Sequence, residues 1–233
     1  MKRVCLLTAL FCMMMVSCKS DGSDGKHKGH EYVDLGLSVK WATCNVGATS
    51  PEDYGDYFAW GETETKSEYT EGNSATYGLS ISELQSQGYI DSDGNLNPQY
   101  DAATANWGGD WRMPTYSEQE ELLNNCTWTW TTRNFHGFRS LITMNQNGVK
   151  GYKVTGPNGN SIFLPAAGDR LESWLGNAGS GGSYGSSTLY DDDSDYEYDC
   201  YCFEYGLHFL RSDILRIGRG YRPYGQSVRP VVE

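Results

Sequence analysis

Residues 190–224 hold many of the side chains whose chemistry suits contact with another molecule. Seven tyrosines lie in this segment, and each combines a fairly rigid apolar ring with a polar hydroxyl. Arginine and aspartate residues between them supply charged groups, and tyrosine and arginine often dominate the energy of binding interfaces. The composition therefore predicts a binding surface. Its candidate contact residues are Tyr190, Asp191, Asp192, Asp193, Asp195, Tyr196, Tyr198, Tyr201, Tyr205, His208, Arg211, Asp213, Arg216, Arg219, Tyr221, Arg222 and Tyr224.

Two features of the same segment allow other chemistry. The aspartates of residues 191–195, with Asp199, offer the oxygen donors that calcium prefers, although such runs are more often solvated loops. Cys200 and Cys202 form a Cys-x-Cys pair, and alternate residues of a strand point to the same face. No histidine is paired with a nucleophile at a recognised spacing; the histidines are His27, His30, His136 and His208. We therefore expect no catalytic residue, no bound metal and no cofactor.

The other two cysteines in the body of the chain are Cys44 and Cys126. In an oxidising compartment these two could form a disulfide, and two buried free thiols are equally compatible with the sequence. The cysteines and histidines do not follow zinc-finger spacing, so a structural zinc site is not expected.

The N-terminal residues predict export and attachment to a membrane. A charged start precedes an apolar run from residue 4 to 16, which is too short to span a bilayer and is typical of a signal peptide. The run ends in Met-Val-Ser-Cys at Cys18, which resembles the lipobox of bacterial lipoproteins, whose cysteine is acylated. We expect a signal peptide over residues 1–17, lipidation at Cys18, and a flexible tether over residues 18–29, with His27 and the adjoining His30 solvated.

The charge of the chain argues against nucleic acid as a partner. The formal net charge is −12, and loss of the signal peptide removes two basic residues and no acidic one. The mature chain therefore carries about −14 and should be repelled by phosphate backbones. We expect contact with a membrane only through the lipid anchor.

The residues from 30 to 233 are enough for one domain with a single core, and most of its elements are predicted to be strands. Pro230 cannot donate a ladder hydrogen bond, so the last strand is expected at the edge of a sheet. Strands are expected within residues 32–42, 51–62, 127–131, 149–155, 161–164 and 228–232, with a hairpin turn at 156–159.

Helices are expected at only two places. Thr115 followed by Glu118 forms a capping box, which predicts a helix from about residue 116 to 124. A shorter helix is predicted at residues 81–87, inside a polar and irregular stretch at 62–99 that is expected to be an insertion. Together these elements predict an α+β domain of antiparallel sheets and few helices.

Six stretches of the domain carry a family resemblance. They are YVDLGLSVKWATCNVGA (32–48), DYFAWGE (56–62), NWGGDWRMPTYSEQEELL (106–123), FLPAAGDR (163–170), SST (186–188) and GQSVRPV (225–231). These stretches resemble the Fibrobacter succinogenes major paralogous domain, which is common in Bacteroidetes lipoproteins. The resemblance implies a C-type-lectin-like fold that is related to formylglycine-generating enzymes, with small antiparallel sheets, a few flanking helices and many loops.

This sequence departs from the family pattern beside the Ser-Ser-Thr motif. Family members usually carry a tryptophan before it and a proline after it, where this chain has Gly185 and Leu189. The Glu-Pro-Asn and Trp-Asn-Asp motifs of calcium-dependent animal lectins are absent from the sequence. The resemblance therefore implies no sugar specificity.

The composition of residues 190–224 also fits a diversified segment. Diversity-generating retroelements mutate adenines, so an AAC codon yields a restricted set of amino acids. Every residue of the segment except Glu197 and Glu204 belongs to that set, while asparagine disappears after Asn177 and lysine after Lys153. Proteins that these elements diversify often have a lectin-like fold with varied positions near the C-terminus. The similarity to such proteins implies a variable segment at 190–224, and an acidic, tyrosine-rich loop of an ordinary family member is equally compatible with the composition.

These observations favour a surface-displayed outer-membrane lipoprotein that binds an extracellular protein or glycan through residues 190–224. One alternative is an oxidase of the formylglycine-generating kind, which would use Cys200 and Cys202. Another is a structural envelope or pilus-associated protein whose domain assembles with others.

Overall fold

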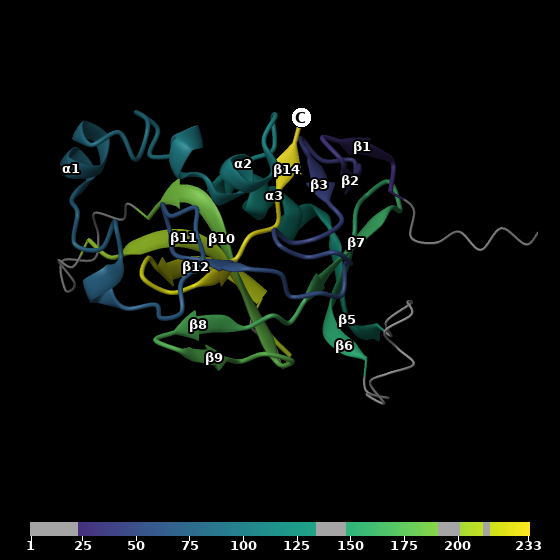
Figure 1. The fold of residues 1–233 in the computed structure, drawn as a ribbon. Helices are drawn as coiled ribbons and strands as arrows, with labels where there is room; N and C mark the ends of the chain where they lie inside the picture. The colour runs from purple at the N-terminus through teal and green to yellow at the C-terminus, as the bar shows by residue number, and fades with distance from the viewer. Residues whose placement is uncertain (1–22, 134–147, 191–200, 212–214) are drawn as a thin grey trace, which may run out of the picture.

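The computed structural model of the chain describes residues 23–133, 148–190, 201–211 and 215–233. Within these ranges the strands form four small sheets, of four, five, three and two strands, and the helices are short (Figure 1). The predicted α+β class, with small and largely antiparallel sheets, is confirmed. Across the described ranges no helix is both long and apolar enough to cross a bilayer. The predicted signal peptide and Cys18 lie outside the described residues.

The first sheet joins the two ends of the described chain. Its strands, in order, are β1 (Gly25–His27), β2 (His30–Val33), β3 (Lys40–Ala42) and β14 (Val231–Val232), and each neighbouring pair is antiparallel. The edge position predicted for the last strand is confirmed. The tether predicted up to residue 29 is wrong over its last residues, because β1 pairs with β2. His27, predicted to be solvated, instead lies against the Trp111 ring and accepts a hydrogen bond from Asp110 N at 3.3 Å. The residues of β1 carry no apolar side chain, so the sequence shows no alternation of apolar and polar residues there. The strand is ordered by its pairing with β2, which the sequence pattern cannot reveal.

The central sheet carries the C-terminal part of the chain. Its order is β12 (Leu215–Tyr221), β11 (Phe203–Leu210), β10 (Gly181–Leu189), β13 (Gln226–Ser227) and β4 (Tyr57–Phe58). All neighbours are antiparallel except β10 and β13, which run parallel at Tyr184 and Ser227. Both residues of β4 are buried, as predicted for the aromatic run.

Two smaller sheets complete the strand structure. The three-stranded sheet is an antiparallel meander of β5 (Thr127–Arg133), β6 (Val149–Thr155) and β7 (Ser161–Pro165). Gly159 N donates to Gly156 O at 3.0 Å, which confirms the predicted turn between β6 and β7. The last sheet is the hairpin of β8 (Asp169–Leu171) and β9 (Trp174–Gly176).

The helices are α1 (Ile81–Ser86), α2 (Ala102–Trp107) and α3 (Tyr116–Asn125), with short 3-10 turns at Glu71–Asn73 and Pro98–Tyr100. The predicted capping box is present, because the Thr115 side chain accepts from Glu118 N and the Glu118 side chain accepts from Thr115 N. Glu118 also binds Arg112 through two hydrogen bonds of 2.6 and 2.7 Å. The cap therefore fixes the start of α3, which packs against β10, β11 and β12.

The stretch 62–99 is part of the core, so its prediction as an insertion is wrong. Leu84, Ile90 and Leu96 are buried in one cluster with Trp60. The helix predicted at residues 81–87 is confirmed as α1. Apolar residues are few and irregularly spaced in the rest of the stretch, which is why the sequence pattern did not reveal its buried positions.

Arg229 is a buried cation that joins distant parts of the chain. Its Nε donates to Asn45 Oδ1 at 2.8 Å, and its Nη1 donates to Ala42 O at 3.0 Å and to Thr43 O at 2.5 Å. Its Nη2 donates to Phe163 O at 2.9 Å. The guanidinium therefore ties the residues before β14 to the N-terminal sheet and to β7.

Candidate ligand-binding surface

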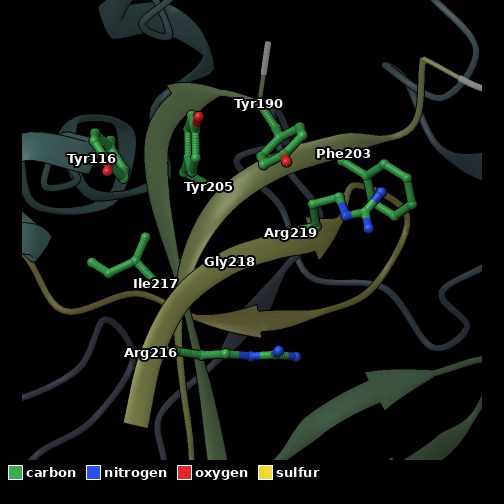
Figure 2. Close-up of a pocket in the computed structure, with 8 residues that line it drawn as sticks. All are labelled: Tyr116, Tyr190, Phe203, Tyr205, Arg216, Ile217, Gly218 and Arg219. Atoms are coloured by element: carbon green, nitrogen blue, oxygen red, sulfur yellow. The ribbon is translucent and has the colours of Figure 1, made fainter. Parts of the chain in front are cut away.

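A cavity of about 580 Å³ opens on the outer face of the central sheet, between α3 and the strands β11 and β12. Figure 2 shows Tyr116, Tyr205, Tyr190 and Phe203 in a row along it, with Arg219 beside Phe203 and Arg216 pointing away from the rings. We call it the ring cavity, and its lining consists of Tyr116, Tyr190, Phe203, Tyr205, Arg216, Ile217, Gly218 and Arg219.

Strand alternation explains why these rings share one face. On β11, Phe203 and Tyr205 are half-buried, whereas Glu204, between them, and Gly206, which follows Tyr205, are buried on the other face. Residues directly opposite each other in an antiparallel pair lie on the same face, and Tyr205 pairs with Arg219. The aromatic and guanidinium groups of β11 and β12 are therefore presented together.

The rings contact one another in sequence along the cavity. Ring centroids lie 4.3 Å apart for Tyr116 and Tyr205, 4.7 Å for Tyr205 and Tyr190, and 6.4 Å for Tyr190 and Phe203. The Arg219 guanidinium carbon lies 5.3 Å from the centroid of Phe203 and 5.8 Å from that of Tyr190. At distances of this size the guanidinium is attracted to the faces of both rings.

The polar groups of the ring cavity can form hydrogen bonds with a ligand. The Tyr116 hydroxyl donates to Glu120 Oε1 at 2.8 Å, and this hydrogen bond, together with burial, raises the pKa of Tyr116 above its usual value. The phenol therefore stays protonated in neutral solution. The lining offers stacking faces, phenol hydroxyls and guanidinium donors, and its described residues include no thiol, histidine or carboxylate.

Comparison with protein-family models, curated proteins and solved structures gave no match. The chemistry of the ring cavity therefore rests on its own residues. Among the described residues, no group of three or more His, Cys, Asp or Glu side chains could hold a metal ion.

The structure brings together four of the predicted contact residues, namely Tyr190, Tyr205, Arg216 and Arg219, in the ring cavity. Tyr221 and Tyr224 line a neighbouring cavity instead. Tyr201 and Arg211 are exposed but line neither cavity. The remaining polar candidates at 191–198 and 213 lie outside the described residues; they are Asp191, Asp192, Asp193, Asp195, Tyr196, Tyr198 and Asp213.

The prediction that Arg222 contacts ligand is wrong. Its side chain is 2% exposed, and its Nη1 donates to the carbonyls of Thr76 and Leu79 at 3.0 and 3.1 Å. Its Nε donates to Phe203 O at 3.0 Å, and burial lowers the pKa of this guanidinium to about 10. Arg222 therefore fastens the loop before α1 to the central sheet.

His208 lies away from the ring cavity, on the opposite face of β11 from Tyr205. Its Nδ1 is 3.3 Å from Ser183 Oγ, and its Nε2 is buried without a partner among the described residues. Burial lowers the pKa of His208 to about 4, with a further contribution from the charge of Arg216. The ring is therefore neutral, and nothing in its setting suits ligand contact.

The prediction from sequence missed four residues of the ring cavity. Phe203, Ile217 and Gly218 lie inside the 190–224 segment, and the alternation of Phe203 with Tyr205 is a signal that could have placed them on one face. Tyr116 follows the cap of α3, and its contact with Tyr205 is tertiary, so no local pattern could have revealed it.

The cysteines occur in two states. Cys44 and Cys126 are free thiols, so the disulfide left open between them is absent. Burial raises the pKa of Cys126 to about 11, which keeps that thiol protonated and unreactive. Cys202 is buried and disulfide-bonded, while Cys200 lies outside the described residues.

Proposed function

We propose that this chain is a lipid-anchored surface protein that binds an extracellular protein or glycan through the ring cavity. The observation that carries the proposal is the continuous row of Tyr116, Tyr205, Tyr190 and Phe203, with Arg219 lying against it. Rigid aromatic faces and guanidinium groups contribute strongly to binding and lose little entropy when a ligand docks. The motifs shared with the Fibrobacter succinogenes major paralogous domain, and the C-type-lectin-like fold they imply, support a scaffold that displays such a surface.

We further propose that the 190–224 segment is diversified by a retroelement. The described residues of the ring cavity within the segment all belong to the amino-acid set that adenine mutagenesis of AAC allows. Glu204, which lies outside that set, is completely buried, as expected for a position that must stay constant. Sequencing the DNA beside the gene tests this part. We expect a near-repeat of the segment's DNA that differs from it mainly at adenines, and a gene for a reverse transcriptase beside it. If both are absent, the segment is not diversified by a retroelement.

Binding through the ring cavity is tested with arrays of glycans and extracellular proteins probed by the full chain. Tyr205→Ala removes the ring that contacts both Tyr116 and Tyr190, so it should weaken any captured ligand by about tenfold or more, as for a central hot spot. Tyr201→Ala is the matched control, because Tyr201 is 48% exposed and lines neither cavity. Equal binding by wild type and Tyr205→Ala, with an unchanged melting temperature, would place the interaction elsewhere.

A further inference from the structure

A second cavity, of about 330 Å³, lies beyond the far end of the ring row. The Phe203 and Tyr221 ring centroids are 5.7 Å apart, and Tyr221 lies 5.0 Å from Tyr224, so the aromatic contacts continue from one cavity to the other. We call this cavity the acidic groove, and its principal lining residues are Tyr69, Glu71, Leu171, Glu172, Tyr221 and Tyr224.

Backbone hydrogen bonds hold the walls of the acidic groove in place. The N–H of Tyr69 donates to Glu172 O and the N–H of Glu172 donates to Tyr69 O, each at 2.9 Å. Arg170 and Gly225 make a similar reciprocal pair at 2.8 and 2.9 Å. Three segments that are distant in sequence are therefore fastened together, and the groove exists before any partner arrives.

The charges of the groove are unbalanced. Neither Glu71 nor Glu172 forms an ion pair with a described residue, although Glu71 accepts a hydrogen bond from the Tyr221 hydroxyl. Two cations lie nearby and are already engaged. Lys66 Nζ binds Glu62 at 2.8 Å, and the Arg170 guanidinium lies over the Tyr57 ring at 5.2 Å.

The aromatic walls add to this negative potential. Tyr221 and Tyr224 line the groove together with the two carboxylates, and the face of an aromatic ring attracts cations. Tyr69 is 1% exposed and Lys66 Nζ lies 5.5 Å from its ring centroid, so its face is already occupied. Burial raises the pKa of Tyr224, and the negative charges of Asp169 and Glu71 raise it further. The same potential that opposes ionisation of a phenol favours a positively charged guest.

An exposed apolar strip borders the groove. Leu171 and Trp174 pair across the β8–β9 hairpin and therefore lie on the same face, where they are 39% and 69% exposed. Glu172, at the tip of the hairpin, has a φ of +53°, a left-handed conformation that is unfavourable for this residue type. The two-residue turn between β8 and β9 requires a positive φ, which accounts for this conformation. Beside Glu172, Leu171 and Trp174 form a small exposed apolar surface.

We propose that the acidic groove binds a lysine or arginine side chain of a protein partner, while Leu171 and Trp174 contact an apolar residue next to it. The cation would pair with Glu71 and Glu172 and lie against the tyrosine faces. This inference does not depend on the ring cavity, since the carboxylates and the apolar strip lie outside the 190–224 segment.

The test titrates the full chain with a short peptide, acetyl-Ala-Lys-Leu-amide. Binding is measured from the NMR chemical-shift changes of the backbone amides at the groove. The same peptide with an acetylated lysine keeps its length but loses its charge. We expect the charged peptide to bind at least about fivefold more tightly, which corresponds to about 1 kcal/mol for a cation–π contact and a screened ion pair. Glu172→Gln should weaken the charged peptide by a similar factor, and Trp174→Ala should weaken both peptides.

Matched controls separate this site from other acidic surface. Glu64→Gln removes one exposed carboxylate that does not line the groove, and Tyr205→Ala alters only the ring cavity, so both should leave peptide binding unchanged. Equal affinity for the charged and acetylated peptides would overturn the inference. The inference would also be overturned if methyl glycosides changed the amide chemical shifts at the groove and the charged peptide did not, because the groove would then be a sugar site. If Tyr205→Ala did not affect binding to the arrays, the proposal for the ring cavity would be contradicted, and the inference about the acidic groove would be unaffected.

Discussion

At the scale of single residues, the most unusual group is Glu204. Its carboxyl is completely buried between β12 and β13, accepts a hydrogen bond from Gln226 Nε2 and leaves Oε2 without a partner among the described residues. Burial raises the pKa of Glu204 to about 7, and the Gln226 hydrogen bond and the charge of Arg222 oppose that effect. Gly220 lies opposite Glu204, where a Cβ would collide with Oε1.

The buried carboxyl makes stability depend on pH in a definite direction. A folded pKa of about 7 lies above the ordinary value of 4.5, so the folded state retains a proton that the unfolded state loses. The contribution is fully present below pH 4.5 and is lost as pH rises through 7, by roughly 3 kcal/mol in total. Glu204→Gln should therefore match wild type near pH 5 and melt at a higher temperature near pH 8. Thermal unfolding at both values measures this.

An exposed carboxylate provides the comparison for that measurement. Glu64→Gln changes the same functional group in water and should shift the melting temperature little at either pH. If the difference between Glu204→Gln and wild type were the same at pH 5 and pH 8, the ionisation of Glu204 would not be responsible.

At the scale of elements, local patterns predicted α1, α3 and the strands β2 to β7 and β14, but not α2 or the strands β8 to β13, which include most of the central sheet. The capping box marked the start of α3 at Tyr116, and the period-two alternation of residues 127–131 matched β5. These elements are encoded by side chains within a few residues of one another. β1 could not be found in this way, because its order comes from pairing with β2.

The candidate site was predictable only in part, for the same reason. Tyrosine and arginine content located the segment that forms the ring cavity, but composition does not tell which side of a strand a residue occupies. Arg222 has the residue type of a binding hot spot, yet the carbonyls of Thr76 and Leu79, far away in sequence, hold it in the core. Tyr116 reaches the cavity only because α3 packs on the central sheet.

At the scale of the whole molecule, Arg229 connects the last residues to the rest of the core. The side chain is 1% exposed, and its donors satisfy Asn45 Oδ1 and the carbonyls of Ala42, Thr43 and Phe163. Methionine has a similar length but no donor, so Arg229→Met leaves these acceptors buried without partners. Each unsatisfied acceptor costs about 1–3 kcal/mol, and we expect a loss of several kcal/mol, which denaturant titration would measure. A change below 1 kcal/mol would show that water replaces the guanidinium.

The position of Arg229 and β14 limits which mutations in the codons for residues 190–224 still give a folded protein. Both lie after the segment 190–224, and both are needed to close the core. An insertion or deletion that shifts the reading frame within that segment would remove them and yield a chain that cannot finish folding. Selection would thus retain base substitutions and in-frame changes there.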